Sequence, residues 1–240
     1  MRSGLKNFLN PMDRFLNTCS ICAELQGNSE SFGWKAYASL VSSGKNRLAT
    51  SGMFDLIPSI GALNASHVLL VPRFHVGSIA CLSDPRFEEL TDFAVQLENF
   101  SNQVHGKQLL FFEHGAGTDI DNSGGCVDHA HLHAVSKVPN FLTELRKHCH
   151  LTPLPDFHAA RQVADTARGY ILVRDEAGVV WLSNNPGVPS QLLRKLYAQC
   201  QQWPDVWNWR IDPRMDEIRN VAKTYHSFMS ARAGDAELRC

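Results

Sequence analysis

The stretch His129-Ala130-His131-Leu132-His133-Ala134-Val135 is the most informative part of this 240-residue chain. Histidine alternates with apolar residues, which is typical of a β-strand whose two faces differ. The three imidazoles are therefore expected on one face of the strand, and the apolar side chains on a buried face. Because neutral imidazole acts as nucleophile, base or metal ligand near pH 7, the pattern indicates a strand that carries chemistry.

Two other interpretations of this strand need no covalent chemistry. The first is a polar strand face on which the histidines are simply solvated. The second is a metal site made of all three histidines. It is geometrically awkward, because His129 and His133 lie about 13 Å apart on an extended strand at ~3.3 Å per residue.

The segments around the histidine strand predict a sheet with packed helices. Asp84 and Pro85 predict the start of a helix, with Asp84 as its N-cap. Apolar side chains then recur at steps of three and four, and Gly106 is expected to close this helix. Further strands are expected over 52–58, 67–72, 108–113, 126–135, 170–173 and 179–182, a glycine-rich loop over 115–125, and helices over 189–200 and 215–228. The sequence thus predicts an α+β fold with a mostly antiparallel sheet, packed helices and a helical C-terminal extension.

Composition excludes several classes of protein. The chain is 44% hydrophobic and 20% charged, with a net charge of −1, which disfavours a disordered chain and an extended nucleic-acid-binding surface. No apolar run approaches the ~18 residues of a membrane span, and the N-terminus lacks the pattern of a secretory signal. Seven cysteines without such a signal indicate a reducing cytoplasm.

At the histidine strand the chain resembles the histidine-triad family of nucleotidyl hydrolases and transferases. Residues 129–135 match the family motif, and residues 66–75 resemble its buried strand followed by Pro-x-x-His. The resemblance implies that His131 attacks the α-phosphorus of a nucleotide-type substrate, giving a covalent nucleotidyl-histidine. It also implies that His133 binds phosphate oxygens and that His129 completes the triad. Backbone N–H groups of Gly124, Gly125 and Cys126 are expected to bind the developing charge.

A metal site is the second expectation. Cys19 and Cys22 form a CxxC, which alone is a moderate signal for a redox pair or a metal site. With His75 and His129 they match the four-ligand set of the zinc-bearing branch of the family, which includes galactose phosphate uridylyltransferases. Two thiolates and two imidazoles suit a structural Zn²⁺ ion. The alternative is two free cysteines in a loop.

Several substrate-contacting positions depart from the family pattern. Glu113 stands where the family often has an asparagine, and its charge would repel phosphates unless it were protonated. Ser59 stands where an acidic or amide residue commonly contacts the ribose. Arg73 or an arginine of the extension is expected to supply positive charge. The remaining candidates lie near a helix start in the extension, where capping is the alternative: Ser190, Gln191 and Arg194.

The expected organisation is an N-terminal leader (1–18), a catalytic domain (19–145) and a C-terminal extension with a hairpin and helices (146–240). The expected function is a nucleotide hydrolase or nucleotidyltransferase, similar to dinucleoside polyphosphate hydrolases, that acts on a phosphoanhydride, phosphoramidate or sugar–nucleotide linkage. The resemblance also implies a homodimer. The alternatives are a hydrolase that uses the histidines as a catalytic metal site, and a non-catalytic nucleotide- or RNA-binding module.

Overall fold

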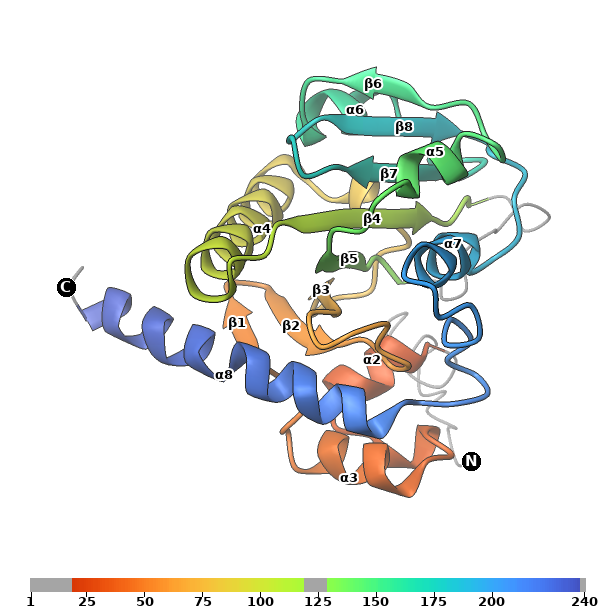
Figure 1. Ribbon diagram of the computed structural model, residues 1–240. Coiled ribbons are helices and arrows are strands. Elements are labelled where there is room, and N and C mark those ends of the chain that lie inside the picture. Colours follow the sequence, from red (N-terminus) through yellow and green to blue (C-terminus); the bar gives the residue numbers. More distant parts are fainter. Residues whose placement is uncertain (1–18, 119–128, 238–240) are drawn as a thin grey trace, which may run out of the picture.

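One antiparallel sheet forms the centre of the computed structural model, which describes residues 19–118 and 129–237, with side chains through Tyr225 and at Phe228. The eight strands of this described part follow the order β1-β2-β3-β5-β4-β7-β8-β6, and every adjacent pair is antiparallel (Figure 1). The strands are β1 (Ala49–Ser51), β2 (Phe54–Pro58), β3 (Val68–Pro72), β4 (Leu109–Gly115), β5 (Leu132–Ser136), β6 (Thr152–Leu154), β7 (Tyr170–Arg174) and β8 (Val180–Asn184). The fold is therefore α+β, as the sequence predicts.

The helices pack on both faces of this sheet. They are α2 (Ser20–Leu25), α3 (Lys35–Ser42), α4 (Asp84–His105), α5 (Phe141–Leu145), α6 (Phe157–Val163), α7 (Leu192–Cys200) and α8 (Met215–Glu237), with 3₁₀ turns η1 (Ser29–Ser31) and η2 (Ile79–Cys81). No helix in the described ranges combines the length and apolar character that a membrane crossing requires.

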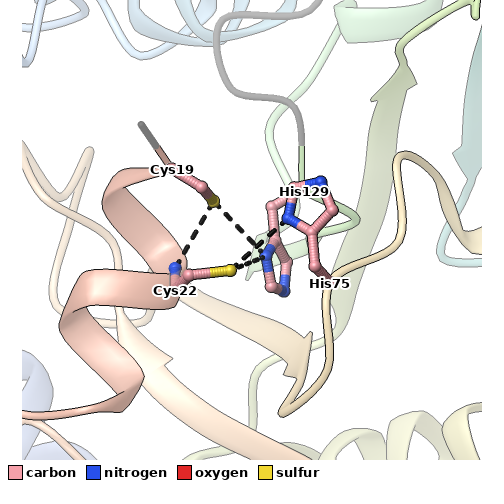
Figure 2. A group of neighbouring side chains, drawn as sticks. All are labelled: Cys19, Cys22, His75 and His129. Carbon is pink, nitrogen blue, oxygen red and sulfur yellow. Dashed lines mark hydrogen bonds between the residues drawn. The ribbon is translucent and has the colours of Figure 1, made fainter. Parts of the chain in front are cut away.

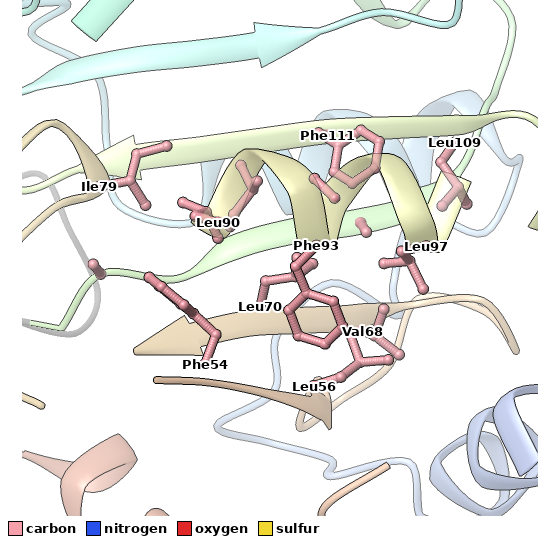
Figure 3. Close-up of a cluster of buried hydrophobic side chains, with 14 of the residues drawn as sticks. Phe54, Leu56, Val68, Leu70, Ile79, Leu90, Phe93, Leu97, Leu109 and Phe111 are labelled. Carbon is pink, nitrogen blue, oxygen red and sulfur yellow. The ribbon is translucent and has the colours of Figure 1, made fainter. Parts of the chain in front are cut away.

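The first face of the sheet is covered by α4, α6 and α8. Leu90, Phe93 and Leu97 of α4 pack onto side chains from alternate positions of the strands, including Leu70 and Phe111 (Figure 3). Each of these five side chains is at most 1% exposed. The three- and four-residue spacing in α4 and the two-residue spacing in the strands together produce this continuous core.

The opposite face has two separate covers. Ile21 and Leu25 of α2 pack on Ile57, Leu69 and Val71 of β2 and β3. Helices α5 and α7 cover strands β4 and β7 through a second apolar cluster, which includes Leu110, Phe112, Ile171 and Val173. A pocket lies between the two covers, lined by side chains from both α2 and α7.

Most elements match the predicted segments, with local differences. Ser83 rather than Asp84 is the N-cap of α4, and Asp84 instead forms an ion pair with Arg161 at 2.6 Å. Gly106 closes α4 in the left-handed conformation, as predicted, with φ of 61°. The strand expected over 126–135 begins only at Leu132. Residues 119–125 of the expected glycine-rich loop, including Gly124 and Gly125, and residues 126–128 of the expected strand, including Cys126, lie outside the described residues, as does the expected leader.

The C-terminal part of the chain belongs to the same sheet. β7 pairs with β4 from Phe111↔Arg174 to Gly115↔Tyr170, so the predicted hairpin of β7 and β8 extends the central sheet. The last helix, α8, packs back on α4 through the stacked rings of Phe93 and Phe228, with centroids 6.3 Å apart. Strands from both sides of the expected boundary at residue 145 therefore share one sheet and one core.

Candidate active site and metal site

The pocket has its floor on three adjacent strands. Leu69 of β3, His133 of β5 and Phe112 of β4 are register partners, so their side chains lie next to one another on one face. The rings of Phe112 and His133 stack with centroids 4.5 Å apart. His131 lines the same pocket just before β5 begins. The sheet thus presents two of the three motif histidines to one cavity.

The backbone determines which nitrogen of His131 carries the proton. Nδ1 of His131 lies 2.6 Å from the carbonyl oxygen of His129. A carbonyl only accepts hydrogen bonds, so Nδ1 must donate and therefore carries the proton in the neutral ring. Nε2 is then left with its lone pair. A partly buried, oriented imidazole with a free lone pair in a pocket has the properties of a nucleophile or a base.

A chain of hydrogen bonds also determines the protonation of His133. The backbone N–H of Leu63 donates to Nδ1 of His67 at 3.0 Å, so the neutral His67 ring carries its proton on Nε2. That Nε2–H donates to Nδ1 of His133 at 2.8 Å. His133 consequently carries its own proton on Nε2. Nε2 of His131 is therefore a hydrogen-bond acceptor and Nε2 of His133 a donor. The arrangement depends on His67, which the sequence predicted only as part of a buried strand.

Burial keeps the pocket histidines neutral. It lowers the pKa of His131, and the positive charge of Arg194 lowers it further, against the opposing effect of the bond to the His129 carbonyl. Burial also holds the pKa of His133 well below its usual range, with charge on His131, His67 and Arg194 acting in the same direction. A further pocket residue, His114 of β4, has its pKa lowered to about 4, mainly by burial. These rings are therefore uncharged near pH 7.

Glu113 lies on the other face of β4 from the pocket. Phe112 and His114 line the pocket, so the period-two geometry of the strand directs Glu113 away from it. Its carboxylate accepts hydrogen bonds from the backbone N–H of Ile79 at 2.9 Å, from the hydroxyl of Tyr170 and from the backbone of His131. Burial raises the pKa of Glu113 to about 7. Glu113, predicted to contact the substrate, therefore lies outside the pocket lining and next to the backbone of His131.

Arg194 of α7 brings the C-terminal part of the chain into the pocket. Its guanidinium donates to the Ser59 hydroxyl at 2.9 Å, to the Gly61 carbonyl at 2.5 Å and to the Trp207 carbonyl at 2.9 Å. Arg194 is 5% exposed, and these hydrogen bonds hold a buried cation at the pocket wall. Ser59 and Arg194, which are separated by 135 residues in the sequence, form one part of the site.

The remaining predicted site residues lie partly inside the pocket and partly outside it. Gln191 lines the pocket, whereas Ser190 is exposed and lies outside the lining. Arg73 is directed to the carbonyl of Gly52 at the protein surface and does not reach the pocket. His129 does not line the pocket and instead contacts the two cysteines at the start of α2, as expected for the metal site.

Cys19, Cys22, His75 and His129 form a compact cluster that could hold a metal ion (Figure 2). The cysteines come from the start of α2, His75 follows β3, and His129 precedes β5. One ligand atom from each residue lies within 4.8 Å of all the others. Nε2 of His129 is 2.9 Å from the Pro72 carbonyl, so it carries the proton and Nδ1 presents its lone pair to the sulfurs.

The spacing of the donor atoms suits tetrahedral coordination. Nδ1 of His129 lies 3.5 Å from Sγ of Cys19 and 3.4 Å from Sγ of Cys22, and Nδ1 of His75 lies 3.4 Å from Sγ of Cys22. Metal–sulfur and metal–nitrogen bonds of ~2.3 and ~2.05 Å at the tetrahedral angle give an S···N separation of about 3.6 Å. The donor set therefore fits a four-coordinate ion without a rearrangement of the fold.

Comparison with known proteins finds similarity only among solved structures. No family model and no curated protein matches the chain. A HIT family hydrolase from Clostridium thermocellum is 16% identical over 52% of this chain and 94% of that chain, with a TM-score of 0.34. A hypothetical protein from Leishmania major is 14% identical over 55% and 93%, with a TM-score of 0.36. A hypothetical histidine triad nucleotide-binding protein from Sulfolobus tokodaii is 16% identical over 42% and 68%, with a TM-score of 0.31.

Proposed function

We propose that this protein is a histidine-triad-type nucleotide hydrolase or nucleotidyltransferase that works through a covalent intermediate on His131. The observation that carries the proposal is the hydrogen bond from Nδ1 of His131 to the His129 carbonyl at 2.6 Å. It leaves the lone pair of Nε2 as the reactive position of a ring that lines the pocket.

The proposed reaction has two displacements at phosphorus. In the first, Nε2 of His131 attacks the α-phosphorus, a P–N bond forms, and the bond from phosphorus to the leaving group breaks with its electron pair. The leaving group takes a proton from a donor in the site or from water. In the second, water or another acceptor attacks the same phosphorus, loses a proton, and the P–N bond breaks to return His131. Dividing one displacement into two is the advantage of nucleophilic catalysis.

Donors in the pocket account for charge stabilisation. Nδ1 of His133 accepts the hydrogen bond from His67, so Nε2 of His133 carries the proton. This Nε2–H donates to a phosphate oxygen. Arg194 adds a fixed positive charge on the wall formed by α7. A preorganised donor in a site that excludes water stabilises developing charge far better than the same donor in solution. We also keep the backbone N–H groups of Gly124, Gly125 and Cys126 as donors for the same charge.

We assign Zn²⁺ to the cluster of Cys19, Cys22, His75 and His129, as a structural ion. Two thiolates and two imidazoles are typical zinc ligands, and four protein ligands leave no open position for a substrate. The ion would join α2 to the segment that leads into β5. Because the site requires thiolates, we also place the protein in a reducing compartment, the cytoplasm.

The alternative of a catalytic metal held by the motif histidines has less support. Among the described residues, the metal-binding group includes His129 but neither His131 nor His133. Nδ1 of each of these two rings already has a partner, the His129 carbonyl and His67 respectively. A pure binding module would bind nucleotides without forming an adduct on His131.

The test is to trap the adduct. The full-length protein is incubated with a panel of nucleotides that carry phosphoanhydride, phosphoramidate and sugar–phosphate leaving groups, then quenched in base and analysed by intact mass. The proposal predicts a mass increase of one nucleotidyl group, located on His131 and absent from His131→Ala. Full turnover by His131→Ala would refute it. Nucleotide binding without an adduct or turnover would identify a binding module.

A further inference from the structure

Gln191 has an unusual combination of features at the pocket wall. It lines the pocket at the start of α7, is 9% exposed, and its buried Oε1 atom has no hydrogen-bond partner among the described residues. A buried amide oxygen without a partner is unfavourable, so such a group in a native protein calls for an explanation, and at the wall of a pocket a bound ligand can supply the bond. The unsatisfied atom therefore points to a contact that forms when the pocket is filled.

The backbone of Gln191 is also unusual. Its φ of 65° lies in the left-handed region, which glycine and asparagine adopt more readily than glutamine. The backbone conformation therefore does not favour glutamine at this position. Glutamine differs from glycine here in its amide side chain, which glycine lacks.

Much of the remaining lining of the pocket is apolar. Ile21 and Leu69 come from the α2 side of the pocket, and Ile60, Leu193 and Trp209 from other parts of the lining. His114 supplies a second buried atom, Nδ1, without a partner among the described residues. A nucleobase has two apolar faces and an edge that both donates and accepts hydrogen bonds. An amide matches such an edge because it also offers both.

We propose that Gln191 is a specificity-determining residue that hydrogen-bonds the edge of a nucleobase whose phosphate lies at His131. This inference rests on the proposed function and extends it, since it assigns base recognition to α7, in the C-terminal part of the chain. The substrate is then a nucleotide selected by its base, and not any phosphate ester that reaches His131.

Binding measurements separate this inference from the proposed function. Calorimetry with the full-length protein measures the dissociation constants of AMP, GMP, CMP, UMP and ribose 5-phosphate, which lack a leaving group on phosphorus. The variants are Gln191→Leu and a matched control, Gln201→Leu. Gln201 ends α7, also has a buried Oε1 without a partner in the described part of the chain, and does not line the pocket.

The wild-type protein is expected to bind its preferred nucleotide at least about tenfold more tightly than ribose 5-phosphate. Gln191→Leu should reduce the preference for that base about three- to tenfold, the effect of one neutral hydrogen bond. Gln201→Leu should keep the preference. A second variant, Gln191→Gly, should show the same loss while its Tm rises by about 2 °C, because the left-handed conformation suits glycine.

Two results would overturn the inference and leave the proposed function standing, provided that the wild-type protein forms its adduct on His131. The first is an unchanged base preference in both Gln191 variants. The second is equal affinity of the wild-type protein for ribose 5-phosphate and for every nucleotide. Failure of the wild-type protein to bind any of the five ligands, together with the absence of an adduct, would instead refute the proposed function and the inference with it.

Discussion

Replacement of Glu113 tests whether a buried carboxylate holds the nucleophile in place. In the structure the carboxylate accepts hydrogen bonds from the backbone N–H of Ile79, the hydroxyl of Tyr170 and the backbone of His131. Glu113→Leu removes every acceptor at a nearly isosteric position. Glu113→Gln keeps a carbonyl acceptor and loses only the charge and one oxygen. The two variants therefore differ in how well they can hold the His131 backbone.

The expected magnitudes follow from the hydrogen bonds. In Glu113→Leu two buried backbone N–H groups lose their acceptor, at ~1–3 kcal/mol each, so the free energy of unfolding should fall by roughly 2–6 kcal/mol. Glu113→Gln should lose about 1 kcal/mol. A displacement of the reacting group by about 1 Å lowers a rate ~100-fold. We therefore expect turnover to fall about 100-fold in Glu113→Leu and less than tenfold in Glu113→Gln.

Urea unfolding measures the stabilities, and single-turnover formation of the His131 adduct measures the rates under conditions where each variant is folded. Leu97→Ala is the control, since Leu97 is fully buried on α4 at the opposite face of the sheet and its loss should cost ~2–5 kcal/mol without a change in rate. If Glu113→Leu forms the adduct at the wild-type rate, Glu113 does not position His131. A rate loss in Leu97→Ala equal to that in Glu113→Leu would show a global effect instead.

Three further predictions concern the metal, the buried acid Glu24 and the hydrogen bonds of His67. Cys22→Ser should lower the zinc content from one ion per chain to nearly none by elemental analysis, whereas His131→Ala and the exposed Cys81→Ser should keep it; retention by Cys22→Ser would exclude the assigned site. Glu24, whose pKa burial raises from 4.5 to about 7, stabilises the fold fully below pH 4.5 and loses up to about 3 kcal/mol as the pH rises through 7. Urea melts from pH 4 to 8 should show a flatter stability profile in Glu24→Gln, and identical profiles would contradict this. His67→Phe leaves the Leu63 N–H and Nδ1 of His133 without partners and should lower the free energy of unfolding by about 2–4 kcal/mol, so unchanged stability would argue against these hydrogen bonds.

The parts of the fold that the sequence predicts well are those specified by local periodicity. The apolar spacing of α4, the closing Gly106 and the β7–β8 hairpin all depend on residues close in the chain. The faces of β4 follow from the same rule. Alternation alone places Glu113 opposite to Phe112 and His114, so the sequence carried a signal that Glu113 lies outside the pocket that these two residues line.

The parts that the sequence does not predict depend on contacts between distant residues. Alternation alone does not show that His129 contacts two cysteines more than 100 residues away, and only the resemblance to the zinc-bearing branch of the family predicted this cluster. His67 is inconspicuous within a buried apolar segment until its contact with His133, 66 residues away, is seen. The role of Arg194 depends on its bond to Ser59, which no local pattern indicates.

The most direct test of the covalent mechanism is the stereochemical course at phosphorus. A nucleotide substrate made chiral at its α-phosphorus with sulfur and an oxygen isotope is converted by the wild-type protein, and the configuration of the product is determined. Two in-line displacements, first by Nε2 of His131 and then by the acceptor, each invert the centre. We therefore predict overall retention of configuration. Overall inversion would show a single direct displacement and would contradict the nucleotidyl-histidine intermediate.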